Sequence, residues 1–145
     1  MKTVLQRVSE ARVKINGEIV GAIDTGLLVL FCAEPDDDQE KASYFARKIA
    51  LMRVFEDDAG KMNLSVSDIG GAVLAVSQFT LVDEWRNGNR PGFSRAADPK
   101  TGEAIYNFFC AELRSHGLVV ETGRFGAAME VSLVNAGPVT IIMDD

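Results

Sequence analysis

A proline that interrupts two strand-like runs limits how the C-terminal part of this chain can fold. Residues 129–134 and 139–143 are rich in apolar and β-branched side chains, and Pro138 stands between them, directly after Gly137. Proline cannot donate to a strand ladder, and glycine adopts backbone angles that other residues avoid. We therefore predict a bend or bulge with exposed carbonyl groups within residues 135–140.

A second informative segment is Ser77-Gln78-Phe79-Thr80. It follows residues 72–76, an apolar run that predicts a buried strand. Because the segment closes that strand, we expect its polar side chains at a sheet edge, where they can meet solvent or a ligand.

Length and composition bound the class of protein. The 145 residues suffice for one domain, 1–145, and the 47% apolar and 25% charged fractions are typical of a globular protein. The longest apolar run, residues 27–33, is too short to span a bilayer, and the first residues turn polar too early for a secretion signal. We expect a cytoplasmic protein without membrane contact.

Cysteine and histidine are too few to suggest a metal site or a catalytic triad. Cys32 and Cys110 each lie in an apolar stretch, which favours reduced thiols in the core. His116, the single histidine, precedes Gly117 and is expected to cap a helix. The sequence holds no phosphate-binding loop or dinucleotide fingerprint, so we predict no metal and no cofactor.

The net charge of −6 argues against an extended surface for DNA or RNA, because such binding depends on many basic side chains. Any RNA contact must therefore be local. The best candidate is a loop with Arg86, Arg90 and Arg95, in which Trp85 and Phe93 could stack on bases. The alternative is that these arginines are ordinary solvated surface.

The sequence predicts a hairpin and several further strands. Asn16-Gly17 predicts a type I′ turn in a hairpin over residues 2–24, and a change in the apolar pattern places a bulge near Ser9-Glu10. Short extended pieces flank a turn at residues 57–60, and Gly70-Gly71 precedes the strand that ends at Ser77. Further strands are predicted at residues 27–33, 118–120, 129–134 and 139–143.

Two helices are expected. Asp37 and Glu40 resemble a capping box, and the apolar positions that follow have helical spacing: Ala42, Phe45, Ala46, Ile49 and Met52. Asp98 and Pro99 begin the second helix, which ends at Gly117 and has an apolar stripe of Ala104, Ile105, Phe108, Phe109 and Leu113. The sequence predicts an α+β fold with a mainly antiparallel, curved or barrel-like sheet and two covering helices.

These residues permit little side-chain chemistry. Thr80 or Ser77 could attack an ester, but neither has an evident base to take its proton, so a positioning or hydrogen-bonding role is favoured. A hydrolase of this kind would orient an activated ester and stabilise the oxyanion with backbone N–H groups. The other possibility is a binding module without catalysis.

At these residues the chain resembles the D-aminoacyl-tRNA deacylase family, known as DTD. The similarity is an ordered series of short motifs along the whole chain. They are residues 5–8, residues 60–65, Ser77-Gln78-Phe79-Thr80-Leu81, Arg90-Pro91 with Phe93, residues 121–126, residues 132–135 and residues 137–140.

The resemblance implies a homodimer with its active sites at the subunit interface. Such a protein hydrolyses the ester bond of D-aminoacyl-tRNA, and of glycine mischarged on alanine tRNA, without metal or nucleotide. Ser77, Gln78, Phe79 and Thr80 form the catalytic segment by this resemblance, with Phe79 and Thr80 supplying N–H groups and packing.

By the same resemblance, Gly137-Pro138 has a cis peptide bond and reaches into the partner's active site. Its carbonyl groups would occupy the space that an L side chain needs, so discrimination comes from exclusion. Arg7 and Met129 are expected to hold this turn, and Asn135 belongs to the same substrate-binding group.

The chain departs from the family pattern in three places. Ala136 stands where Asp is usual, Ala128 stands where a larger residue is frequent, and residues 81–89 lack the usual run of basic side chains. Two other functions remain open: a related deacylase with a trans Gly-Pro turn that acts on L-alanyl esters, and a catalytically silent RNA-binding dimer.

Overall fold

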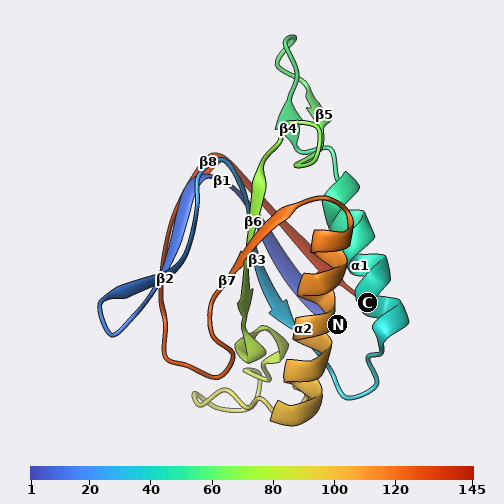
Figure 1. Cartoon of the computed structure of the whole chain (residues 1–145). Helices are drawn as coiled ribbons and strands as arrows, with labels where there is room; N and C mark the ends of the chain where they lie inside the picture. Colours follow the sequence, from blue (N-terminus) through green and yellow to red (C-terminus); the bar gives the residue numbers. More distant parts are fainter.

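The computed structural model describes residues 1–145 as one curved, mixed sheet with two helices on one side (Figure 1). The strands of this sheet are β1 (Lys2–Ile15), β2 (Glu18–Ile23), β3 (Gly26–Cys32), β6 (Ala72–Ser77), β7 (Val119–Thr122) and β8 (Glu130–Asp144). The remaining elements are α1 (Gln39–Leu51), the small sheet of β4 (Phe55–Glu56) and β5 (Met62–Leu64), the 3₁₀ helix η1 (Phe79–Val82), and α2 (Pro99–Ser115). The predicted α+β class with a curved sheet and two helices is confirmed.

Strand order is β2-β1-β3-β6-β7, and β8 pairs with the other side of β1. The pairs of β1 with β2, β3 and β8 are antiparallel, whereas β3–β6 and β6–β7 are parallel. The parallel pairs follow from the chain path, because α1 and α2 each lie on a crossover between two parallel strands. The sheet is therefore more mixed than the sequence indicated.

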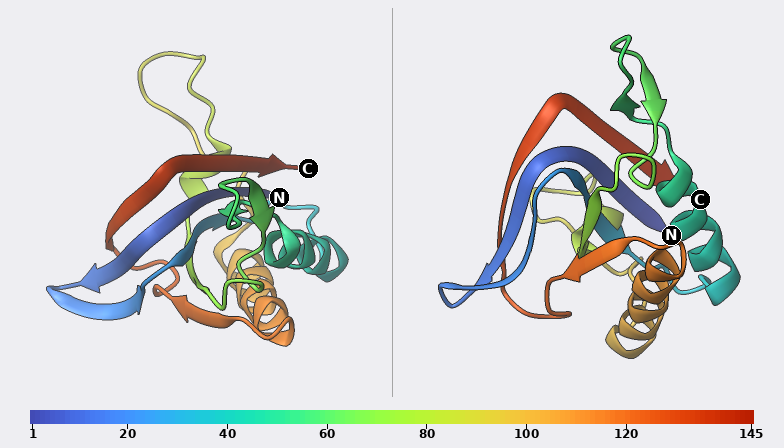
Figure 2. Two further views of the ribbon diagram at one scale, coloured as in Figure 1. Left: turned by 90° about the horizontal axis from the view of Figure 1, so that it is seen from above. Right: turned by 45° about the horizontal axis from the view of Figure 1, so that its top comes forward.

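The sheet curls until β2 lies near β7. A Cβ atom built on Gly21 of β2 would lie 2.5 Å from the carbonyl oxygen of Thr122 in β7, so only glycine permits this close approach. Figure 2 shows β1 and β8 bending together, which makes the sheet nearly closed. The bend coincides with register shifts in the β1–β8 ladder, one of which is the predicted bulge at Ser9.

Local sequence signals explain most element boundaries. Asn16 and Gly17 have φ of 50° and 80°, as the predicted type I′ turn requires. Asp98 caps α2 by accepting from the N–H groups of Lys100 and Thr101, and Gly117, with φ of 82°, follows its end. The β4–β5 turn also lies where it was predicted.

Two boundary predictions and one predicted buried position were wrong. The cap of α1 is Asp38, whose side chain accepts from the Lys41 N–H, because Asp37 is used elsewhere. Residues 129–134 and 139–143 belong to one strand, β8, because β1 continues to pair with it on both sides of the turn. Ala104 is exposed on α2, and Tyr106 and Cys110 take the buried positions.

Two apolar clusters fill the fold. The larger one lies between the sheet and the helices, and its largest fully buried side chains include Phe31, Phe45 and Phe109. The smaller one lies within the curl of the sheet, around Val13 and Leu74. Cys32 and Cys110 are buried and free, which confirms the prediction of core thiols. No helix has the length and apolar character needed to cross a membrane.

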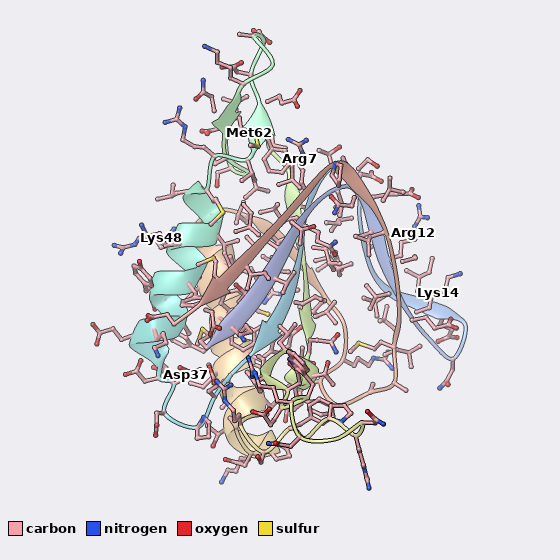
Figure 3. The ribbon with its side chains drawn as sticks, turned by 180° about the vertical axis from the view of Figure 1, so that it is seen from behind. Arg7, Arg12, Lys14, Asp37, Lys48 and Met62 are labelled. Atoms are coloured by element: carbon pink, nitrogen blue, oxygen red, sulfur yellow. The ribbon has the colours of Figure 1, made fainter.

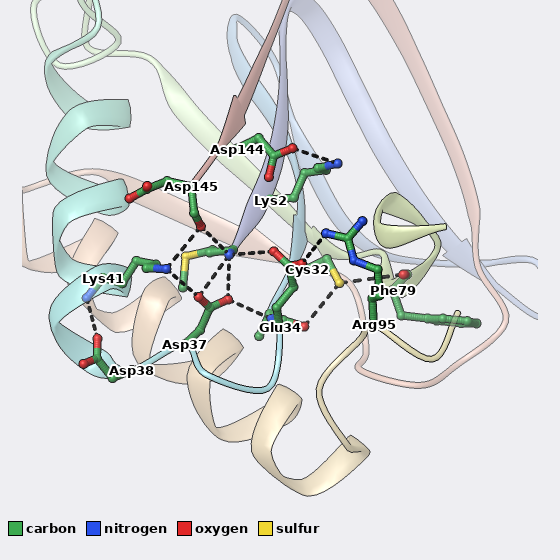
Figure 4. A network of polar contacts seen from close by, with 12 residues as sticks. Lys2, Cys32, Glu34, Asp37, Asp38, Lys41, Phe79, Arg95, Asp144 and Asp145 are labelled. Atoms are coloured by element: carbon green, nitrogen blue, oxygen red, sulfur yellow. Dashed lines mark hydrogen bonds and ion pairs between the residues drawn. The ribbon is translucent and has the colours of Figure 1, made fainter. Parts of the chain in front are cut away.

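A buried polar network joins the two ends of the chain (Figure 4). The α-amino group of Met1 lies 2.9 Å from Glu34 and 2.8 Å from Asp37, and it donates to the Asp145 carbonyl oxygen. Lys41 lies 3.1 Å from Asp37. Burial alone would raise the pKa of Asp37, but hydrogen bonds from the Glu34 N–H, the α-amino group and Lys41 outweigh it, so its pKa is lowered. Asp37 is thus a charged anchor for three segments.

The substitution Asp37→Asn should lower the free energy of unfolding at pH 7 by about 1–3 kcal/mol, because it removes a carboxylate from a buried charged network. A lowered carboxyl pKa gives stability that is present above the unfolded-state pKa and lost as the pH falls through the folded-state value. The difference between variant and wild type should therefore shrink below about pH 4. Urea unfolding at pH 7 and pH 3 measures both effects.

Asp36→Asn is the matched control, since Asp36 is exposed and takes no part in the network. Equal losses of stability in the two variants would contradict the assignment of Asp37 as an anchor.

Candidate functional site

A cavity of about 550 Å³ opens beside the end of β6. Its walls come from the end of β6 and the residues after it, from the loop that precedes α2, and from the β7–β8 connection. The lining residues are Val76, Ser77, Gln78, Phe79, Phe93, Ala96, Ala97, Pro99, Phe125, Gly126, Ala127, Met129 and Val131. The predicted catalytic segment therefore lies at a cavity, and Met129 lies there too.

The main chain holds Ser77-Gln78-Phe79-Thr80 in place. Ser77 pairs with Phe31 of β3, and the Gln78 N–H donates to the Phe31 carbonyl oxygen at 2.7 Å. The chain then turns into η1, in which the Leu81 N–H donates to the Gln78 carbonyl. Because the first residues of a helix have no acceptor within it, the N–H groups of Phe79 and Thr80 are free to bind another group.

Side chains complete this segment. The Gln78 amide donates to the Thr80 hydroxyl, which orients that hydroxyl. The Phe79 ring is 59% exposed and packs edge-on against Phe93, with 5.2 Å between ring centroids. Thr80 does not line the cavity.

None of the lining side chains is titratable. The nearest thiol is Cys32, whose Sγ lies 3.7 Å from the Phe79 carbonyl oxygen. Burial, and then the negative charge of Glu34, raise its pKa to about 11, so at neutral pH it is a protonated thiol and not a nucleophile. No three His, Cys, Asp or Glu side chains come together in an arrangement that could hold a metal ion.

Arg7 holds the turn at residues 135–140 from one side (Figure 3). In the β1–β8 ladder, Gln6 pairs with Thr140 and Val8 with Asn135, so the residues between them bulge out opposite Arg7. Arg7 Nε donates to the Ala136 carbonyl oxygen at 2.8 Å, and a terminal nitrogen of Arg7 donates to the Val54 carbonyl at 2.7 Å. The predicted bulge is confirmed, and Arg7 is partly buried at 11% exposure.

Asn135 holds the turn from the other side. Its side-chain oxygen accepts from the Val139 N–H, and its amide nitrogen donates to the Thr140 hydroxyl, both at 2.9 Å. Gly137 has φ of 132°, and its bond to Pro138 is cis. Gly137 and Pro138 are both exposed.

The cavity and the turn lie at opposite ends of the protomer. Arg7 is at the bend of β1 and β8, beside the β4–β5 hairpin, whereas η1 and the loop that precedes α2 lie at the other end (Figures 1 and 3). Met129 stands eight residues before Gly137 on the chain and lines the cavity, so within one protomer it does not hold the turn. The structure therefore brings Ser77, Gln78, Phe79 and Met129 together, and Arg7, Asn135, Gly137 and Pro138 together, as two separate groups.

The arginine loop borders the cavity through Phe93, Ala96 and Ala97. Arg95 is 2.9 Å from Glu34, and Arg86 lies over the Trp85 ring at 5.0 Å from its centroid. Arg90 has no carboxylate partner within 4.0 Å.

Comparison with known proteins gives consistent results. The family model for D-Tyr-tRNA(Tyr) deacylase matches residues 4–144. The chain belongs to this family. It is 58% identical over 144 residues to the D-aminoacyl-tRNA deacylase of Ruegeria pomeroyi, and the match covers 99% of each chain. The family predicted from the motifs is thus confirmed, and as a member the chain is a hydrolase, as predicted.

Solved structures extend the similarity to the fold. One, titled c-Myc DNA Unwinding Element Binding Protein, has a TM-score of 0.93 at 41% identity and covers 100% of this chain and 99% of that chain. Another, titled as a probable eukaryotic D-amino acid tRNA deacylase, has a TM-score of 0.85 at 17% identity and covers 99% of this chain and 98% of that one. The second supports the deacylase fold alone.

Several cavity residues carried no sequence signal strong enough to assign them a role. Ala96, Ala97, Ala127 and Val131 are small or aliphatic residues that could equally serve the core. Phe125 and Gly126 belong to a family motif, at residues 121–126, which was the one available clue.

We expect Gly137→Ala to destabilise the protein by about 1–3 kcal/mol. A Cβ atom there would lie 2.5 Å from Arg7 Nη2 and 3.1 Å from Val139 Cγ2, and φ of 132° is unfavourable for any L residue. Gly60→Ala is the control, because Gly60 also has positive φ but has open space around it. Urea midpoints of the two variants measure how much more Gly137→Ala costs than a positive φ in open space. A Gly60→Ala loss as large as that of Gly137→Ala would contradict a contribution from the crowding at Arg7 and Val139.

Proposed function

We propose that this protein hydrolyses the ester bond between a D-amino acid and tRNA, releasing both, and so proofreads the handedness of aminoacyl-tRNA. Family membership supports the reaction class. The observation that carries the proposal is a cavity that ends at Ser77-Gln78-Phe79 and is lined by no titratable side chain. Such a site suits a substrate that is already activated and needs positioning more than acid or base catalysis.

Backbone N–H groups, rather than side chains, stabilise the transition state of this reaction. An aminoacyl ester has a hydroxyl on the neighbouring ribose carbon, which can assist attack by water. The N–H groups of Phe79 and Thr80, unbonded within η1, can donate to the oxyanion that forms at the acyl carbon. The exposed Phe79 ring offers a surface for the terminal base.

Thr80 acts in positioning and not as the nucleophile. Its hydroxyl oxygen accepts a hydrogen bond from Gln78, and no base lies among the cavity side chains to take its proton. A hydroxyl without such a base is a weak nucleophile at neutral pH.

The functional unit is a homodimer in which each cavity receives the Gly137-Pro138 turn of the partner subunit. Within one protomer the turn is exposed and lies far from the cavity, at the bend of β8 (Figure 3). β8 pairs on one side only, so its free edge can pair with another chain. Val134 and Ile142 on this strand are 49% and 67% exposed, and they provide apolar surface for the interface.

Handedness is read by exclusion. The carbonyl groups of the partner's turn fill the volume that an L side chain would need, and a D side chain points away from them. Glycine has no side chain to exclude, so glycyl-tRNA is also a substrate. Arg7 and Asn135 keep the turn rigid enough for this rejection, through the contacts to Ala136 and Val139.

The decisive assay incubates the protein with D-Tyr-tRNA, L-Tyr-tRNA, Gly-tRNA and L-Ala-tRNA and follows release of the amino acid. We expect turnover of the D-tyrosyl and glycyl esters and at least 100-fold slower release of L-tyrosine, a difference of about 2.7 kcal/mol. Preferred hydrolysis of L-Ala-tRNA would indicate a deacylase of the other specificity, and no turnover of any ester would indicate a silent RNA-binding dimer.

Thr80→Ala should keep kcat for D-Tyr-tRNA within about tenfold of wild type, because the variant loses one oriented hydroxyl but keeps the backbone N–H groups. Circular dichroism controls for the fold. If the folded variant lost activity by about 10⁴-fold, Thr80 would be the nucleophile after all.

A further inference from the structure

Three cationic side chains at the cavity end of the protomer have no acidic partner. Arg90, Lys100 and Arg124 are exposed, and none has a carboxylate oxygen within 4.0 Å of its charged nitrogens. They come from three different segments: the loop that precedes α2, the first turn of α2, and the β7–β8 connection.

Each of these segments also supplies an apolar wall of the cavity. Pro99 directly precedes Lys100, Phe125 directly follows Arg124, and Phe93 lies three residues after Arg90. The three segments gather at the same end of the molecule (Figure 1). The three cations, which we call the basic rim, therefore come from segments that also form walls of the cavity.

Carboxylates close to the basic rim in sequence form no ion pair with it: Glu84 and Asp98 are engaged elsewhere, and Glu103 and Glu121 have no cationic nitrogen within 4.0 Å. Glu84 accepts from the Arg86 N–H and lies 4.0 Å from its guanidinium. Asp98 accepts from the N–H groups of Lys100 and Thr101 as the cap of α2. The charged ends of the basic rim are thus left for a ligand from outside the protomer.

We propose that Arg90, Lys100 and Arg124 bind backbone phosphates of the single-stranded 3′ end of tRNA, upstream of the nucleotide whose ester enters the cavity. This inference rests on the proposed function. A chain with a net charge of −6 cannot hold RNA by a broad positive surface, so its phosphate contacts must be concentrated near the reacting end.

The surroundings fit a single strand better than a duplex. Proteins that bind single-stranded nucleic acid combine phosphate-binding cations with aromatic rings on which bases stack. Here the exposed Phe79 ring and its neighbour Phe93 lie at the cavity, whose walls come partly from the segments that carry the basic rim.

The test compares D-Tyr-tRNA with 3′-O-D-tyrosyl-adenosine, which has the same ester but no phosphate. Arg90→Glu, Lys100→Glu and Arg124→Glu should each lower the ratio of kcat/KM for tRNA to that for the adenosine ester by at least fivefold. The lower kcat/KM for tRNA should come mainly from a higher KM. The salt dependence of kcat/KM for tRNA should become shallower, by a slope of about 0.7 for each phosphate contact removed.

Lys48→Glu is the matched control, since Lys48 is also exposed and without a carboxylate partner but lies on α1, away from the cavity. The proposal is overturned if Lys48→Glu lowers the ratio as much as the rim variants do, or if no rim variant lowers it.

A failure of the proposed function can be distinguished from a failure of the phosphate contacts. If wild-type protein hydrolyses neither ester, that function fails, and binding of a short single-stranded RNA with a tRNA 3′ sequence then decides the phosphate contacts. Equal affinity of wild type and the triple rim variant would overturn the proposal, and at least tenfold weaker binding by the variant would support it.

Discussion

The contacts of Arg7 are the constraint on which the proposed specificity depends. Its side chain donates to the carbonyl oxygens of Ala136 and Val54, which belong to the turn in β8 and to the base of the β4–β5 hairpin. If the turn moved, the Arg7 guanidinium could not keep hydrogen bonds to both carbonyl groups. The turn is therefore held in one position. Asn135 closes the other side of the turn with its amide. The backbone at residues 135–140 is thus fixed by side chains rather than by the β1–β8 ladder, which is interrupted there.

This arrangement suits a filter made of backbone. Carbonyl groups are poor at attracting a particular amino acid, but in a fixed position they exclude any side chain that would overlap them. The cavity does not select a particular amino acid by charge either, because no charged side chain lines it. Protonated Cys32 behind Phe79 adds no nucleophile. Selection by handedness without selection by side-chain chemistry is the expected result.

The sequence predicted what depends on local signals. Asn16-Gly17, Asp98-Pro99 and Gly137-Pro138 each require particular backbone angles or capping groups, and each marks a real turn, helix start or bulge. Features that depend on contacts between residues far apart in sequence were not predicted. Asp37 does not cap α1 because it meets the α-amino group of Met1, which is remote in sequence. The parallel pairing of β6 and the cavity walls at Ala97 and Val131 likewise depend on the tertiary path and leave no periodic signal.

The separation of cavity and turn has a consequence for the whole assembly. The proposed catalytic segment lies at one end of a protomer and the exposed turn at the other, so the proposed joint action on one substrate requires a second copy. A two-fold dimer does this twice, because an isologous interface repeats each contact. The free edge and exposed apolar residues of β8 lie on the same strand as the turn, so pairing through β8 would place the turn at the interface.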